Sequence, residues 1–144
     1  MKPVDEIDNR NPEDPLSFWR LAQDARTFLA AHHWCKSIRR GFLDIGWEGI
    51  LAVFYFELEP ASEEVDDSVW VVVGDVPPAY ISNTNTDGAT ALDGYVYEMQ
   101  RWVDAVKNGQ PVDDLVPVDV PATLEHAEML EKRLDFIRQR LLSD

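Results

Sequence analysis

Residues 50–58 read ILAVFYFEL, nine positions of which only Glu57 is charged. Aliphatic and aromatic residues at this density are typical of a β-strand, and the scarcity of polar positions indicates a strand covered on both faces for much of its length. A second run, VWVVV, follows at residues 69–73. Because the connection over residues 60–68 is short, we expect the two strands to pair as an antiparallel hairpin.

This hairpin lies within a segment of unusual charge. Residues 41–100 contain no lysine, arginine or histidine and carry twelve acids, whereas the whole chain has a net charge of −14. Such a field repels nucleic acid and anionic membranes and attracts basic proteins or cations. Nonspecific nucleic-acid binding is excluded as a function class, since its affinity comes from cations on the protein.

Beyond the hairpin, Gly74-Asp75-Val76-Pro77-Pro78 ends the second strand, because prolines cannot donate ladder hydrogen bonds. Ala79–Ser82 is expected to return as a short edge strand. The sequence also predicts three helices. Apolar residues recur at spacings of three and four over Leu16–Arg40, Thr90–Asn108 and a last segment from Pro121 or Ala122 to Leu142.

The predicted fold class is therefore α+β. We expect a small antiparallel sheet of two to four strands, packed against three helices mainly on one face, in the order α-β-β-(β)-α-α. Residues 1–15 hold three prolines and are expected to form a polar, extended or poorly ordered arm, with residues 16–144 forming a single domain.

Composition limits the compartment. One cysteine, Cys35, excludes an internal disulfide framework, and the polar start of the chain does not resemble a signal peptide. No apolar run approaches the ~20 residues that a membrane-spanning helix needs. We expect a soluble cytoplasmic protein with no membrane partner.

The acids of the hairpin form the main candidate site. The expected partner-binding residues are six acids of the strand end and turn, together with two residues of the following corner: Glu57, Glu59, Glu63, Glu64, Asp66, Asp67, Asp75 and Tyr80. The functional interpretation is an anionic binding patch, and the structural alternative is a solvated turn beside a rigid corner.

His32-His33-Trp34-Cys35 is the second candidate. On a helix His32 and Cys35 would be three positions apart, so they could begin a zinc site or form a nucleophilic pair. A zinc site needs further ligands, and His126 is the only other histidine. The pattern is incomplete, which favours a structural role for His32 and Cys35 and predicts no metal or cofactor.

Three segments carry a resemblance to known proteins: VVVGDVPPAYIS at residues 71–82, GYVYEMQRWVDAVKNG at residues 94–109 and VPATLEHAEMLEKRLDFI at residues 120–137. In these segments the chain resembles families of short acidic bacterial proteins, domains of unknown function for which the resemblance implies no activity. In size, acidity and α+β pattern it is also similar, by class only, to toxin-immunity proteins.

The sequence thus favours a non-enzymatic acidic binding protein. Its most concrete form is an immunity protein that neutralises a basic bacterial toxin by occluding it, with the acids steering and pairing with the toxin's cations. Two alternatives stay open. One is a small metal-binding protein or hydrolase that uses His32 and Cys35, and the other is a homodimeric structural or regulatory protein in place of a monomer.

Overall fold

The computed structural model describes residues 1–9, 13–60, 67–82 and 87–142. Two compact units make up the chain, Met1–Ala91 and Leu92–Asp144. The prediction of one domain over residues 16–144 stays a prediction. The elements of the first unit are β1 (Lys2–Pro3), a 3₁₀ turn (Val4–Glu6), α1 (Phe18–Ala30), β2 (Cys35–Trp47), β3 (Leu51–Pro60), β4 (Ser68–Gly74) and β5 (Val76–Ser82).

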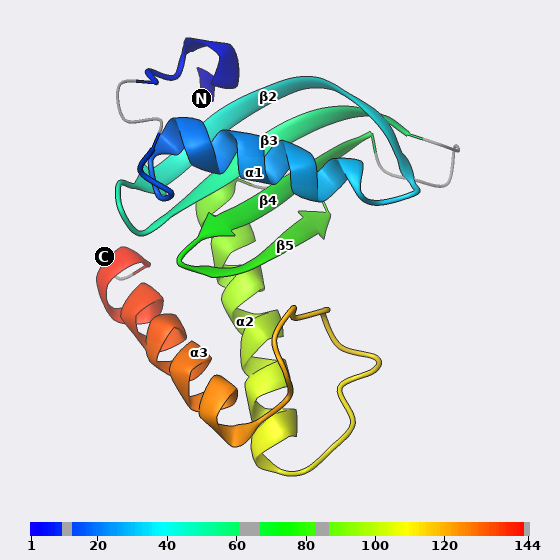
Figure 1. The fold of residues 1–144 in the computed structure, drawn as a ribbon, viewed down its shortest axis with the longest axis vertical. Coiled ribbons are helices and arrows are strands. Elements are labelled where there is room, and N and C mark those ends of the chain that lie inside the picture. Colours follow the sequence, from blue (N-terminus) through cyan, green and yellow to red (C-terminus); the bar gives the residue numbers. More distant parts are fainter. Residues whose placement is uncertain (10–12, 61–66, 83–86, 143–144) are drawn as a thin grey trace. The chain divides into compact units, whose positions relative to one another are not determined.

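The strands form one antiparallel sheet in the order β1-β2-β3-β4-β5, so each strand lies beside its neighbours in sequence (Figure 1). The predicted α+β class is confirmed. The predicted strand number and order are wrong, because the sheet has five strands and the chain begins with a strand. Lys2 and Pro3, within the expected N-terminal arm, pair with Leu43 and Phe42.

The first predicted helix is also too long. It begins at Phe18, two residues after the predicted start, where the Ser17 hydroxyl accepts a hydrogen bond from the Arg20 amide, and it ends at Ala30. In the rest of the predicted helix, residues 31–34 form the connection to β2 and residues 35–40 belong to β2, which pairs with β3 over Cys35–Trp47. Helical spacing continues by coincidence to Cys35, and pairing with a strongly strand-forming neighbour overrides that local pattern.

The core of this unit lies between α1 and one face of the sheet. Alternate residues of β3, including Phe54 and Phe56, form one buried cluster with Leu21 and Leu29 of α1. Gly41 fits the same interface, since a Cβ atom there would lie 2.5 Å from the Phe56 ring. The sequence indicated a helix end at Gly41, but the glycine is needed for close packing within β2.

The second unit consists of most of α2 (Gly88–Lys107), then α3 (Leu124–Phe136) and a π-helical turn (Ile137–Leu141). Both predicted C-terminal helices are confirmed. Side chains join the two helices directly: Lys107 Nζ lies 2.6 Å from Glu131, and Gln100 donates to Glu131 at 3.0 Å. Among the described residues, no helix is long and apolar enough to cross a membrane.

Candidate recognition surface

Two of the predicted partner-binding acids, Glu57 and Glu59, lie on β3 and face cations of β2. Two nitrogens of Arg40 contact the Glu57 carboxylate, the shortest distance being 2.8 Å. The Ser37 hydroxyl donates to Glu59 at 3.0 Å, and Lys36 Nζ lies 3.5 Å from the same carboxylate. Neither acid is therefore an isolated negative charge. Sequence reasoning missed these pairs because it placed Lys36 and Arg40 on a helix.

These contacts stabilise the ionised form of Glu59. The hydrogen bond from Ser37, followed by the charge of Lys36, lowers the pKa of Glu59 below its ordinary value. The carboxylate thus stays charged at neutral pH while part of its charge is neutralised locally.

The other predicted acids do not form one site. Glu63, Glu64 and Asp66 lie outside the described residues. Asp67 precedes β4, whereas Asp75 forms the turn between β4 and β5, so the seven-residue strand separates them. At about 3.3 Å per residue, the ends of β4 are roughly 20 Å apart. Asp75 cannot share a contact point with Asp67.

Tyr80 instead belongs to an aromatic cluster at the end of α1, which we define as Phe28, His32, Trp34 and Tyr80. Ring centroids lie 4.9 Å apart for Trp34 and Tyr80, 5.2 Å for His32 and Tyr80, and 5.0 Å for His32 and Trp34. Phe28 completes the cluster at 4.8 Å from His32. Tyr80 is 38% exposed and the other three rings are half-buried, so the cluster is partly open to solvent.

Three elements position these rings. Phe28 lies in the last turns of α1, His32 and Trp34 lie in the connection to β2, and Tyr80 lies on β5 opposite Val71. The His32 ring is fixed by Nδ1, which lies 2.8 Å from the Phe28 carbonyl oxygen. A carbonyl oxygen only accepts, so Nδ1 carries the proton.

His32 and Cys35 do not share a helix face, because α1 ends before both of them. Cys35 is buried at the start of β2, and burial raises the pKa of its thiol. His126 lies on α3, where its Nδ1 is 2.7 Å from the Thr123 hydroxyl. No group of three or more potential metal ligands occurs in the parts of the chain that the structure describes. The geometry therefore gives the proposed zinc site and nucleophilic pair no support.

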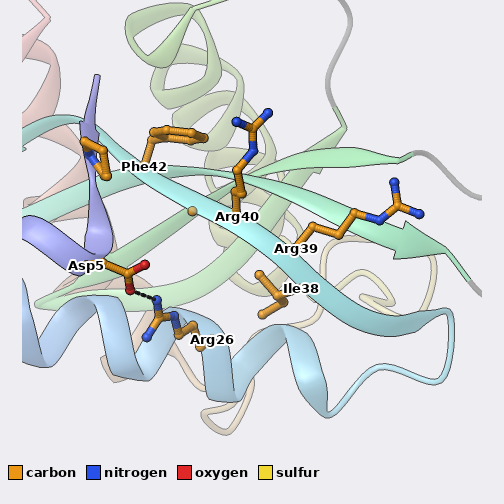
Figure 2. Close-up of a pocket in the computed structure, with 8 residues that line it drawn as sticks. Asp5, Arg26, Ile38, Arg39, Arg40 and Phe42 are labelled. Atoms are coloured by element: carbon orange, nitrogen blue, oxygen red, sulfur yellow. Dashed lines mark hydrogen bonds and ion pairs between the residues drawn. The ribbon is translucent and has the colours of Figure 1, made fainter.

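A second surface was not expected from the sequence. Along the outer edge of β2 run two adjoining hollows, of about 450 and 300 Å³, which share Arg26 and Ile38 and which we call the edge groove. Figure 2 shows the larger hollow, where Arg26 contacts Asp5 while the side chains of Arg39 and Arg40 extend from β2 in different directions. The sequence does not predict this groove, because its helical spacing places Lys36, Arg39 and Arg40 at the end of a helix rather than on a strand.

Comparisons of this chain with models of protein families, with curated proteins and with solved structures found no match. The resemblance to short acidic bacterial proteins, and the class similarity to toxin-immunity proteins, stay predictions. Function is therefore argued from the residues and their geometry.

Proposed function

We propose that this chain is a non-enzymatic protein-binding protein, and that its contact surface is centred on the aromatic cluster. The observation that carries the proposal is the packing of Trp34 and Tyr80 at 4.9 Å on a partly exposed surface. Tryptophan and tyrosine are enriched among the residues that dominate binding energy in protein interfaces. Rings held by their neighbours also lose little conformational freedom on binding.

The negative net charge of the chain favours a positively charged partner. The unit Met1–Ala91 has seven lysine and arginine residues against sixteen acids, and the chain as a whole has a net charge of −14. A basic partner is attracted by this field, and its lysine or arginine side chains can stack on the faces of Trp34 and Tyr80. An immunity protein that occludes a basic toxin remains the most concrete form of this function. Its cytoplasmic location stays a prediction.

The enzymatic alternative is less well supported by the same geometry. A nucleophilic cysteine needs a lowered pKa and access to substrate, whereas the Cys35 thiol is buried and its pKa is raised. The chain offers no other cysteine.

Affinity capture from the native host tests the proposal. The full chain is immobilised, retained proteins are identified by mass spectrometry, and each is purified for measurement of Kd at low and high salt. We expect a basic protein whose binding weakens with salt, and whose Kd rises about tenfold or more for Tyr80→Ala, in line with loss of an interface aromatic.

Tyr97→Ala is the matched control, because Tyr97 is also an exposed tyrosine (64%) but lies on α2 in the other unit. It should leave the Kd unchanged. Equal binding by Tyr80→Ala and the unchanged chain, or capture of acidic proteins only, would contradict the proposal.

A further inference from the structure

The edge of β2 that faces away from β3 has a strand partner over only two residues in the described part of the chain, although the 3₁₀ turn Val4–Glu6 also contacts β2. β1 pairs with β2 only at Phe42 and Leu43. Along Cys35–Gly41 the outer edge meets no strand among the residues that the structure describes. The outward N–H and C=O groups of an edge strand are a template on which another extended segment can pair.

The charge along this edge is opposite to that of the chain. Four of the seven lysine and arginine residues of Met1–Ala91 line the edge groove: Arg26, Lys36, Arg39 and Arg40. Three of these cations form ion pairs at the protein surface. Arg26 contacts Asp5, Lys36 contacts Glu59, and Arg40 contacts Glu57. Exposed pairs contribute only about 0–1 kcal/mol, so an incoming carboxylate can replace such an acid at little cost.

Arg39 is the cation of this groove that forms no ion pair with the acids that the structure describes, although its charge contributes to lowering the pKa of Glu59. The β2–β3 register shifts between Ile38 and Arg40, which makes Arg39 the extra residue of a β-bulge. Similar shifts occur at Lys36 and Asp44, whose side chains contact Glu59 and the Gly88 amide. Arg39 forms no hydrogen bond or ion pair with any described residue. Bulges redirect side chains, and here the bulge leaves a guanidinium directed away from Arg40 (Figure 2).

The charges select the occupant of the edge. Charged residues often protect edge strands from self-pairing, and a second copy of β2 would place cations opposite cations, which is destabilising. An acidic strand would instead place carboxylates opposite these cations, which is stabilising. On the face away from α1 its carboxylates would lie near Arg40 and the neighbouring Arg39, both of which extend away from α1 in Figure 2. On the α1 face its apolar side chains would lie near Ile38 and Ala30.

We propose that the open edge of β2 binds an extended segment of another protein by strand addition, and that this segment alternates acidic and small apolar residues. Backbone hydrogen bonds to Cys35–Gly41 supply the pairing, and Arg39 supplies the discrimination for acidic side chains. This surface is separate from the aromatic cluster, and its proposed partner has the opposite charge.

The test uses the full chain and a fluorescent eight-residue peptide of alternating Glu and Val. We expect saturable binding by fluorescence anisotropy, with slower amide hydrogen exchange within Lys36–Gly41 when the peptide is bound. Arg39→Glu should raise the Kd by about tenfold or more, because it replaces the cation that faces the peptide's carboxylates with an acid. A tenfold rise corresponds to a loss of about 1.4 kcal/mol of binding free energy. Lys132→Glu, the same charge change at an exposed residue of α3, should leave the Kd within about twofold.

Two further peptides separate strand addition from simple charge attraction. A peptide methylated on alternate backbone nitrogens keeps every charge but cannot complete the ladder, so its binding should be lost. A peptide of alternating Gln and Val should bind at least about tenfold more weakly, because it lacks the carboxylates. Equal binding by the methylated peptide, no binding of the acidic peptide, or no added protection within Lys36–Gly41 would each overturn the proposal. Tyr80→Ala should leave peptide binding unchanged, which separates this site from the proposed function.

Discussion

Arg40 and Glu57 lie directly opposite each other on β2 and β3, and two nitrogens of the arginine contact the carboxylate. In the sequence, Glu57 belongs to a segment of sixty residues without a single cation. The sheet brings a cation to it from just outside that segment. Charge counted along a chain therefore overestimates the negative surface wherever an oppositely charged strand pairs beside it.

The Arg40–Glu57 pair should contribute little to stability. The Arg40 side chain is 67% exposed, and exposed ion pairs measured by double-mutant cycles give about 0.2–1 kcal/mol. We expect Arg40→Ala, Glu57→Ala and the double variant to give a coupling energy in this range by urea unfolding. A coupling well above 1 kcal/mol would show that the pair is held more rigidly than an ordinary surface pair.

Glu59 should titrate below the ordinary range for a glutamate, because the Ser37 hydrogen bond and the Lys36 charge lower its pKa. The effect can be measured by following the Glu59 side-chain carbon by NMR as the pH is lowered. Ser37→Ala should raise the Glu59 pKa toward its ordinary value, and Lys36→Ala should also raise it, because it removes both a charge and a hydrogen bond. An unchanged titration in Ser37→Ala would show that the hydroxyl does not donate to Glu59 in solution.

Gly41 and Gly94 should respond to alanine in opposite directions. A Cβ atom at Gly41 would meet the Phe56 ring, so Gly41→Ala is expected to destabilise the fold by about 1–3 kcal/mol, as overpacking does. Gly94 lies inside α2, and a Cβ atom added there would have nothing within 4 Å, so Gly94→Ala should stabilise by about 0.5–1 kcal/mol. Both values can be read from urea unfolding. A neutral Gly41→Ala would argue against the close approach of β2 to Phe56.

The sequence pattern of each element explains whether that element could be predicted. β3 and β4 were identified because their runs of aliphatic and aromatic residues have no competing helical pattern, and α2 and α3 because their apolar spacing is sustained. β2 was not, since Lys36, Arg39 and Arg40 interrupt its apolar residues and three bulges break the alternation expected of a strand. β1 has only two residues, too few for any periodic signal.

The site was less predictable than the fold. Tyr80 was singled out from the rigid corner that precedes it, but its ring partners lie about fifty residues earlier in the chain, and only the packing of α1 beside β5 brings them together. The edge groove could be predicted only if β2 were placed correctly, because the groove lies along that strand. Both depend on long-range pairing, for which a single sequence holds no direct signal.

Cys35 should be unreactive in the folded protein. Its side chain is buried and its pKa is raised by burial, so little thiolate is present or accessible at neutral pH. We expect negligible reaction with a disulfide reagent such as DTNB under native conditions, and one thiol per chain after unfolding in guanidinium. Rapid reaction of the native protein would revive the alternative of a catalytic cysteine.

The contact between Lys107 and Glu131 should make the second unit sensitive to acid. Hydrogen bonds from Lys107 and then Gln100 lower the pKa of Glu131 in the folded state. A lowered folded pKa adds stability above the unfolded value of about 4.3, and this stability is lost as the pH falls through the folded pKa.

Glu131 should therefore contribute at neutral pH and progressively less below about pH 4–5. The complementary contribution of Lys107, whose pKa is raised chiefly by its hydrogen bond with Glu131, is present at neutral pH and is lost only as the pH rises through its folded value above 10.5. Urea unfolding at pH 7 and pH 3 measures the acid limb. Glu131→Gln should reduce the difference between these two pH values, whereas Asp113→Asn, at an exposed position between α2 and α3, should not. The same pH dependence in Glu131→Gln and in the unchanged chain would assign the acid sensitivity to other carboxylates.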